Sequence, residues 1–224
     1  MWEAGRNPSD VFKGLVMRIV TLLRSGGDFI QHYLYDLVNG IIKHNPDAEI
    51  YCLTDMHIEH KNIKPIFMQD LPPKWWGKLL LFELFKEGST LYMDIDTVCV
   101  GKLNTLFRRT KGFTMLENVY RKGHVGSGVM SWMGDYSYLT EEYKSIGADV
   151  VHREYTTTMK WGDQGFIEHN LRDKPDFFGS KCLSYKAQVA NKMLRLPKET
   201  SLVYFHGKPR PWETSSCKLA LWSN

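Results

Sequence analysis

Two aspartates, Asp94 and Asp96, stand two positions apart directly after the apolar run Leu91-Tyr92-Met93. In an extended chain alternate residues point to the same side, so both carboxylates face one point. Like charges there repel unless a cation lies between them, and such oxygen ligands suit magnesium or manganese, whose remaining positions a diphosphate can fill. The pair therefore indicates a divalent-cation site. A solvated acidic turn at the end of a strand is the alternative, equally open from these residues alone.

A histidine near the other end of the chain can complete such a site. His206 follows the apolar residues 202–205 and opens the segment Gly207-Lys208-Pro209-Arg210-Pro211-Trp212. A neutral imidazole can be the third metal ligand, and Lys208 or Arg210 can meet diphosphate oxygens. A surface histidine beside a basic turn is the commoner arrangement for a lone histidine, but the aspartate pair makes it less favoured here. We predict that Asp94, Asp96 and His206 bind Mn²⁺ or Mg²⁺.

The elements that precede the aspartates read as a βαβ unit. Residues 17–23 form a mostly apolar run that ends at Ser25-Gly26-Gly27, and paired apolar residues from position 29 to position 42 predict an amphipathic helix. Residues 49–54 are a second strand, which ends at Asp55. Such a connection nearly always makes two parallel strands, whose carboxyl ends border ligands in an open α/β sheet. We expect Ser25, Asp55 and the Asp94–Asp96 pair to converge there.

The pattern continues with a proline-containing loop and a second unit. Residues 75–86 have a helical pattern, Gly88-Ser89 turns the chain, and residues 90–93 are the strand before the aspartates. The remaining part of the chain is more mixed. It predicts helices over residues 103–109, 138–146 and 164–170, and strands over residues 113–116, 128–132 and 202–205.

Composition places the chain among ordinary globular proteins. It has 224 residues, of which 43% are hydrophobic and 24% charged, enough for the core of one domain. The net charge of +4 favours anionic ligands only weakly. Its 4 cysteines form no C-x-x-C pair, which argues against a zinc knuckle and favours the reducing cytosol. No segment has the length and apolar character of a signal peptide or membrane helix, and residues 1–16 are predicted to be an extension.

Four separated segments together resemble the glycogenin-like retaining glycosyltransferases of family 8 and their bacterial and phage relatives. The resemblance spans residues 18–212 and rests on residues 92–96, 100–103, 161–165 and 206–212, in the family's order. It implies a GT-A fold: a Rossmann-like mixed sheet flanked by helices, in one domain over residues 17–224. Residues 17–101 would be the nucleotide-sugar half and residues 102–224 the acceptor half. It also implies manganese between Asp94, Asp96, His206 and the diphosphate of a UDP-linked hexose donor.

The resemblance also implies roles for individual positions. The turn over residues 21–27 and Asp55 would border the nucleoside, Lys78 would reach the donor, and Ser127-Gly128 would line the sugar pocket. Two departures are a shorter segment after His206 and Gly126 in place of an asparagine. The donor-binding residues implied are Thr21, Leu22, Ser25, Asp55, Lys78, Asp94, Ile95, Ser127, Gly128, Gly207, Lys208 and Arg210.

Asp163 and Gln164 resemble the D-Q pair that lies beside the transferred sugar, and they are our candidate catalytic residues. In a retaining reaction the donor phosphate takes the acceptor proton and Asp163 positions the sugar, whereas in an inverting reaction Asp163 is the general base. The alternative for Asp163 is a helix N-cap before residues 164–170.

The acceptor is open among a glycan, a protein and a modified DNA base. A basic group, Arg108, Arg109, Lys111, Arg121 and Lys122, would be either a positive face beside the acceptor or a solvated surface. Trp212 is the tryptophan best suited to stack on a sugar. Two other functions compete: a metal-dependent nucleotidyltransferase or pyrophosphatase, which would show a stronger Gly-rich loop than Arg24-Ser25-Gly26-Gly27, and a non-catalytic nucleotide-sugar-binding module.

Overall fold

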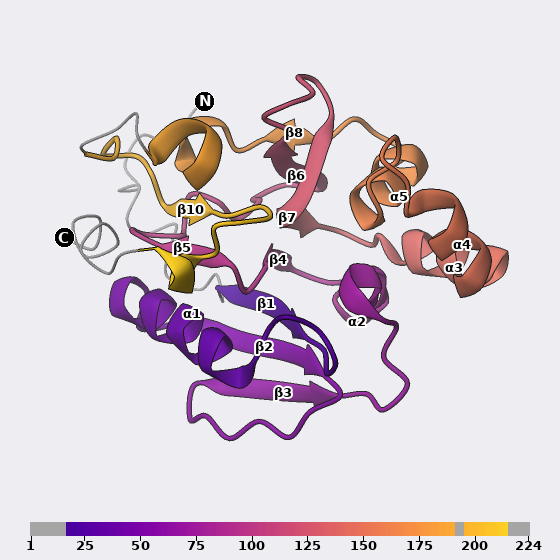
Figure 1. Ribbon diagram of the computed structural model, residues 1–224, viewed down its shortest axis with the longest axis horizontal. Helices are drawn as coiled ribbons and strands as arrows, with labels where there is room; N and C mark the ends of the chain where they lie inside the picture. Colours follow the sequence, from indigo (N-terminus) through magenta and orange to yellow (C-terminus); the bar gives the residue numbers. More distant parts are fainter. Residues whose placement is uncertain (1–16, 191–194, 215–224) are drawn as a thin grey trace, which may run out of the picture.

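A computed structural model describes residues 17–190 and 195–214. Its main sheet has seven strands in the order β3-β2-β1-β4-β7-β6-β8, and a second sheet has three in the order β5-β10-β9 (Figure 1). The strands are β1 Arg18–Leu23, β2 Glu49–Thr54, β3 Ile63–Phe67, β4 Ser89–Met93, β5 Thr97–Cys99, β6 Gly112–Glu117, β7 Val125–Met133, β8 Asp176–Phe177, β9 Cys182–Ser184 and β10 Leu202–Tyr204. The α-helices are α1 Gln31–His44, α2 Leu81–Leu84, α3 Ser137–Ile146, α4 Ala148–Tyr155 and α5 Asp163–Asn170. Short 3₁₀ or π-helical turns are η2 Lys74–Leu80, η3 Gly179–Lys181, η4 Tyr185–Val189 and η5 Pro211–Glu213.

The first βαβ unit is confirmed. β1 pairs in parallel with β2 from Arg18↔Glu49 to Leu23↔Thr54, and α1 connects them. β1 also pairs in parallel with β4, so the carboxyl ends of these three strands share one edge of the sheet. The sheet is mixed because β7 runs antiparallel to both β4 and β6. This is the predicted α/β class.

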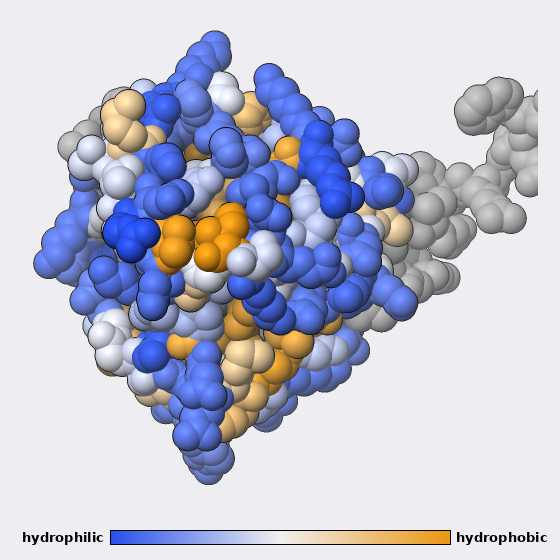
Figure 2. All heavy atoms as spheres, turned by 90° about the vertical axis from the view of Figure 1, so that its right-hand side faces the viewer, coloured by the Kyte–Doolittle hydropathy of each residue, from blue (hydrophilic) through white to orange (hydrophobic). Residues whose placement is uncertain are grey.

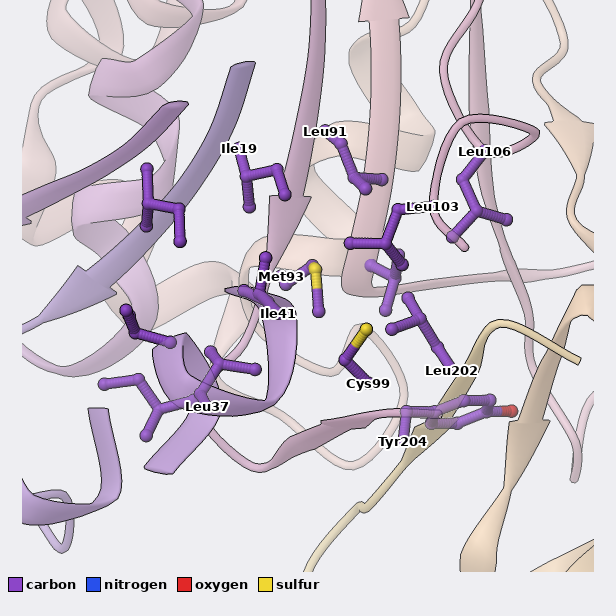
Figure 3. Packing of buried hydrophobic residues seen from close by; sticks show 14 of the residues in the cluster. Ile19, Leu37, Ile41, Leu91, Met93, Cys99, Leu103, Leu106, Leu202 and Tyr204 are labelled. Carbon is purple, nitrogen blue, oxygen red and sulfur yellow. The ribbon is translucent and has the colours of Figure 1, made fainter. Parts of the chain in front are cut away.

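Alternate residues of the strands divide the core into two layers. Figure 3 shows Ile19 of β1 and Leu91 and Met93 of β4 on the side where Leu37 and Ile41 of α1 pack. The intervening strand residues pack on the opposite side against η2, α2, α3 and α5. The face that carries α3, α4 and α5 is largely hydrophilic, with a small apolar group at its centre and a second apolar area below it (Figure 2). The apolar sides of these helices are therefore turned toward the sheet.

Two segments differ from the sequence-based expectation. Residues 75–86, expected to be one helix, form the 3₁₀ segment η2 followed by the single turn α2. The proline-containing stretch before them holds β3, in which Pro65 pairs with Cys52. β3 is the outermost strand, and an edge strand tolerates a residue without a backbone N–H.

The helix expected over residues 103–109 is wrong. Leu103, Leu106 and Phe107 are buried, as a helical stripe would be, but the chain there is irregular. The Asn45 side chain accepts a hydrogen bond from the Leu103 backbone N–H at 2.9 Å and donates one to the Gly101 carbonyl at 3.3 Å. A long-range side chain thus replaces the backbone partners that a helix would supply.

The small sheet brings the chain before His206 to the Asp94–Asp96 turn. β10 pairs antiparallel with β5, with Tyr204 opposite Thr97, and the Phe205 backbone N–H donates to the Asp96 carbonyl at 3.1 Å. The chain after β10 therefore leaves the sheet beside the Asp94–Asp96 turn.

Over residues 17–190 and 195–214, none of the helices has the length and apolar character needed to cross a membrane.

Candidate active site

A buried lysine links three segments at the carboxyl end of β4. Lys78 Nζ lies 3.1 Å from both carboxylate oxygens of Asp94, 3.1 Å from Asp163 Oδ2 and 3.4 Å from Ser127 Oγ. Ser127 Oγ in turn donates to Asp163 Oδ2 at 2.6 Å. Lys78 comes from η2, Asp94 from the end of β4, Ser127 from β7 and Asp163 from the start of α5. We call these four residues the Lys78 cluster.

In the Lys78 cluster, burial and the oppositely charged neighbours act in opposite directions on the pKa of Lys78 and on that of Asp163. Burial alone would lower the pKa of Lys78, but the charges of Asp163 and Asp94 outweigh it, so the net shift is upward. Burial raises the pKa of Asp163, while Lys78 and the Ser127 hydrogen bond oppose that rise. Asp94 is the outward member, with 26% of its side chain exposed against 4% for Lys78. The cluster thus offers one accessible carboxylate held by a buried cation.

Asp96 is buried beside Asp94 and is paired with Arg210. Burial and the neighbouring charge of Asp94 raise the pKa of Asp96 to about 7, against the lowering effect of Arg210 and Lys78. Arg210 Nη1 donates to Asp96 Oδ2 across 114 positions of sequence. Of the two cations that the sequence left open for the diphosphate, Arg210 thus reaches the site. Lys208 is exposed and lies 3.4 Å from Glu213.

The two carboxylates fit a hard divalent cation. They lie close enough for the charge of one to raise the pKa of the other, which is the repulsion that a cation relieves. His206 Nε2 lies 2.8 Å from Ser184 Oγ, and burial, with Lys186 and Arg210, lowers the pKa of His206. In the described part of the chain, no group of three or more His, Cys, Asp or Glu side chains is placed to hold a metal. The three-residue ligand set stays a prediction.

The predicted nucleoside border is assembled at the ends of β1 and β2. Asp55 accepts hydrogen bonds from the Ser25 backbone N–H at 2.7 Å and from Ser25 Oγ at 2.6 Å, and Arg24 Nη1 lies 3.1 Å from its Oδ2. These Ser25 hydrogen bonds and Arg24 outweigh burial and lower the pKa of Asp55. The guanidinium of Arg24 is therefore paired with Asp55 at the side of the loop. Thr21, two residues before the end of β1, is buried with its hydroxyl unpaired among the described residues.

Two of the predicted donor-binding positions have side chains that belong to the core. Leu22 packs so closely on Gly77 that an added Cβ there would lie 3.0 Å from it, and Ile95 is part of the apolar layer under α1. Only their backbone atoms are therefore suited to contact a donor. Gly128 has the opposite character, since a Cβ on it would lie 3.3 Å from Asp94 Oδ2. A side chain at this position would crowd the carboxylate. Gly207 has φ of 65°, a conformation that glycine adopts without strain.

Asp163 and Gln164 face different surroundings. Asp163 is the first residue of α5, and the N-cap is Gly162, with φ of 73° and no side-chain cap hydrogen bond. The N-cap role for Asp163 is therefore wrong, because its carboxylate is turned to Lys78 and Ser127. Gln164 instead lines a pocket between α5 and the residues that follow β6. The structure brings only Asp163 of this pair to the Lys78 cluster.

The start of α5 is held by a close backbone contact at Gly165. A Cβ on Gly165 would lie 1.7 Å from the Lys160 carbonyl oxygen, so Gly165→Ala must displace the loop before α5. We expect this variant to lose several kcal/mol of unfolding free energy, within the range of severe overpacking or backbone strain. Gly40→Ala is the matched control, because Gly40 is inside α1 and its Cβ would meet Cys99 at 3.9 Å.

Gly40→Ala should stabilise the protein by about 0.5–1 kcal/mol through the higher helix propensity of alanine. The two free energies can be measured by urea unfolding. Equal effects of the two substitutions would contradict the close contact at Gly165.

Trp212 and two residues of the basic run make specific contacts. The ring of Trp212 stacks on Tyr33 at 3.6 Å with an interplanar angle of 2°, which covers one of its two faces. Arg108 lies 2.5 Å from Asp176 and donates to Thr114 at 2.9 Å, so it joins β6 to β8. Arg121 is the member of the run that borders the Gln164 pocket.

Tyr92 is a site residue that sequence reasoning missed. Its hydroxyl donates to Asp94 Oδ1 at 2.5 Å, and burial, with the charge of Asp94, raises its pKa well above the usual value. The sequence contains a pattern that indicates this role: Tyr92 stands two positions before Asp94 and therefore lies on the same face of the strand. The apolar run around it favoured the interpretation of a core residue.

Known proteins support the fold. No protein-family model matches the chain. The apo form of the glycosyltransferase GlyE from Streptococcus pneumoniae aligns with a TM-score of 0.68 at 13% identity, covering 92% of this chain and 59% of GlyE. The galactosyltransferase LgtC, in complex with donor and acceptor sugar analogues, aligns with a TM-score of 0.62 at 14% identity, covering 92% of each chain.

One curated relative is similar in sequence. Inositol phosphorylceramide glucuronosyltransferase 1 of Arabidopsis thaliana is 27% identical over 109 residues, which are 47% of this chain and 18% of that protein. The chain thus spans less than a fifth of this relative and 59% of GlyE. The fold of this chain is the GT-A fold of solved glycosyltransferases.

Proposed function

We propose that the protein is a metal-dependent glycosyltransferase, which moves a hexose from a UDP-linked nucleotide sugar to a hydroxyl acceptor with retention. The observation that carries this function is the Lys78 cluster, in which Lys78 is buried between Asp94 and Asp163. Withdrawing such charges from water costs several kcal/mol per ion, and clustered, perturbed groups of this kind are typical of active sites. The cluster lies at the carboxyl end of β4, at the edge of the sheet where open α/β folds bind ligands.

Asp94 and Asp96 would hold Mn²⁺ or Mg²⁺, and His206 is the proposed third ligand. The ion would supply charge neutralisation for the departing diphosphate. Arg210, which is paired with Asp96, has the charge and the planar donor group to bind diphosphate oxygens. Ser184 bonds to His206 Nε2 and so orients the imidazole. These residues form the leaving-group side of the site.

The nucleoside and the sugar would lie on either side of this group. Ser25 and Asp55, joined by two hydrogen bonds, would border the nucleoside. Ser127 and Gly128 would line the sugar, since Ser127 Oγ is already oriented by Asp163 and Gly128 leaves space beside Asp94. Lys78 would hold the Asp94 carboxylate in place. The bound donor would thus extend along the carboxyl edge of the sheet.

The geometry of Asp163 favours a positioning role. One carboxylate oxygen, Oδ2, is engaged by both Ser127 and Lys78. A general base must instead reach the acceptor hydroxyl and take its proton. With Asp163 held inside the Lys78 cluster, the donor phosphate is the group left to take that proton. This arrangement supports retention.

The buried thiols of Cys52, Cys99 and Cys182 suit a reducing compartment, and we place the reaction in the cytosol.

The proposal is tested by release of nucleoside diphosphate from a panel of nucleotide sugars, measured by luminescence with Mn²⁺ or with EDTA. We expect release from a UDP-hexose with Mn²⁺ and a loss of at least roughly a hundredfold with EDTA, because the leaving group then lacks its counter-charge. Candidate acceptors are added in a second series, and the anomeric configuration of the product is read by NMR. Release that persists in EDTA would refute metal dependence, and an inverted product would refute retention. A folded protein without release in either series would contradict the enzymatic function itself.

A further inference from the structure

A pocket of about 420 Å³ opens beside α5. Its volume lies within the roughly 300–1,000 Å³ of small-molecule sites. The α5 wall is one helix face, made by Gln164, Gly165, Glu168 and His169. The other walls come from the loop between β6 and β7 and from the residues between α4 and α5.

The loop between β6 and β7 is preformed. The Asn118 backbone N–H donates to the His124 carbonyl at 2.8 Å, and Asn118 Oδ1 accepts from the Tyr120 and Arg121 backbone N–H groups, each at 3.0 Å. The Gly123 backbone N–H donates to Glu117 Oε1 at 2.9 Å. A loop closed by its own hydrogen bonds loses little entropy when a ligand binds.

Arg121 ties this loop to the opposite wall. Its Nη1 donates to the Met159 carbonyl at 2.9 Å, and its guanidinium lies 5.3 Å from the ring centroid of Trp161. Its Nη2 lies 3.4 Å from His124 Nε2. An arginine has five N–H donors, so these contacts leave donors for a ligand. The guanidinium is thus fixed at the pocket rim.

The charge of the lining is positive. Arg121 and Lys160 are the two permanent cations of the pocket, and Glu168 is its one carboxylate. Glu168 Oε1 is held by His124 Nδ1 at 3.0 Å, so its charge is directed to the histidine. The planar amide of Gln164 adds a donor and an acceptor suited to hydroxyl groups. The lining therefore combines hydroxyl recognition with attraction for an anion.

The pocket lies next to the proposed reaction centre. Gln164 borders the pocket, and the preceding residue, Asp163, belongs to the Lys78 cluster. The same loop also reaches toward the predicted metal ligand, because the ring of Tyr120 meets His206 edge-on at 5.4 Å. A molecule in the pocket would present its hydroxyl groups toward the start of α5.

We propose that this pocket is the acceptor subsite and that it takes a saccharide bearing an acidic group, a phosphate or a carboxylate. The proposal rests on the proposed glycosyltransferase function. Arg121 and Lys160 bind the acidic group, and Gln164 orients the hydroxyl that receives the sugar. These two cations attract the acidic group, and the carboxylate of the lining, Glu168, is already paired with His124. A neutral saccharide of the same size lacks this attraction and binds less well.

The test is isothermal titration calorimetry of the full chain, without donor, using glucose 6-phosphate, glucuronate and neutral glucose. We expect at least one acidic sugar to bind about tenfold or more tightly than glucose, which is the usual effect of a charge-assisted hydrogen bond. Arg121→Gln and Lys160→Gln should each remove most of that preference. Lys122→Gln is the matched control, because Lys122 is exposed and adjacent to Arg121 but does not line the pocket. Lys160 is itself exposed, so its variant is the safer one for folding.

The two acidic sugars distinguish a phosphate from a carboxylate ligand. Equal binding of all three sugars, no binding of either acidic sugar, or an equal loss in Lys122→Gln would overturn the proposal. Binding of a short DNA duplex in place of the acidic sugars would assign the surface to nucleic acid and would overturn it too. Because the titration contains no donor, its result is independent of the nucleoside diphosphate assay, and either proposal can fail alone.

Discussion

Lys78→Met is expected to slow sugar transfer strongly and to lower the free energy of unfolding by about 3–5 kcal/mol, the usual cost of breaking a buried ion pair from one side. Lys78 lies 3.1 Å from Asp94 and from Asp163, and the substitution leaves both carboxylates without this cation. Asp163 is itself buried, so the hydrogen bond from the Ser127 hydroxyl is then left to compensate its charge. For a chain of this size the melting temperature should fall by roughly 10 °C.

The activity loss should be roughly a hundredfold to a thousandfold in kcat, as for removal of one electrostatic contact in an active site. Lys86→Met is the matched control: Lys86 is exposed and the charge change is the same. Thermal unfolding and nucleoside diphosphate release of both variants give the comparison. If Lys78→Met has the same melting temperature as Lys86→Met, the Lys78 cluster does not contribute to the stability of the fold.

Asp96→Asn is expected to abolish transfer while raising the stability of the metal-free protein. Burial and the charge of Asp94 raise the pKa of Asp96 to about 7, so the folded protein favours the neutral form of this carboxyl. Asparagine has the shape of that neutral form and carries no charge at any pH. We therefore expect a higher melting temperature at pH 8 in EDTA, together with a loss of Mn²⁺-dependent activity of at least roughly a hundredfold.

The same shift predicts a pH dependence with a definite sign. The pKa of Asp96 is about 7 in the folded protein against a reference value of 3.8, so the folded state binds the proton more tightly. Its contribution to stability is present below pH 3.8 and is lost as the pH rises through about 7. Asp96→Asn should flatten this part of the stability profile in EDTA. Asp47→Asn, at an exposed aspartate, is the control and should leave the profile unchanged. An Asp96→Asn protein that is less stable at pH 8 would contradict the electrostatic account.

Local pattern was enough to predict most of the elements near the site. β2 is found at the predicted residues, and β1, β4 and α1 differ only at their ends, because alternation and the 3.6-residue period report which side of an element is buried. The same pattern failed at Leu103, Leu106 and Phe107. Their helical spacing is real, but the Asn45 side chain satisfies the Leu103 backbone N–H from a distant segment. Periodicity measures burial, and it does not say which partner takes the backbone hydrogen bonds.

The sequence by itself determined which residues end the strands of the sheet: Ser25 and Asp55 meet at the ends of β1 and β2, and Asp94 follows β4. Only the tertiary structure decided which distant side chains meet them. Arg210 and not Lys208 reaches Asp96, and Gln164 turns to a pocket while Asp163 joins Lys78. The physical reason is that spacing along one strand or helix fixes which side each residue faces. The distance between two elements is set by how their buried faces pack, and no local pattern contains that distance.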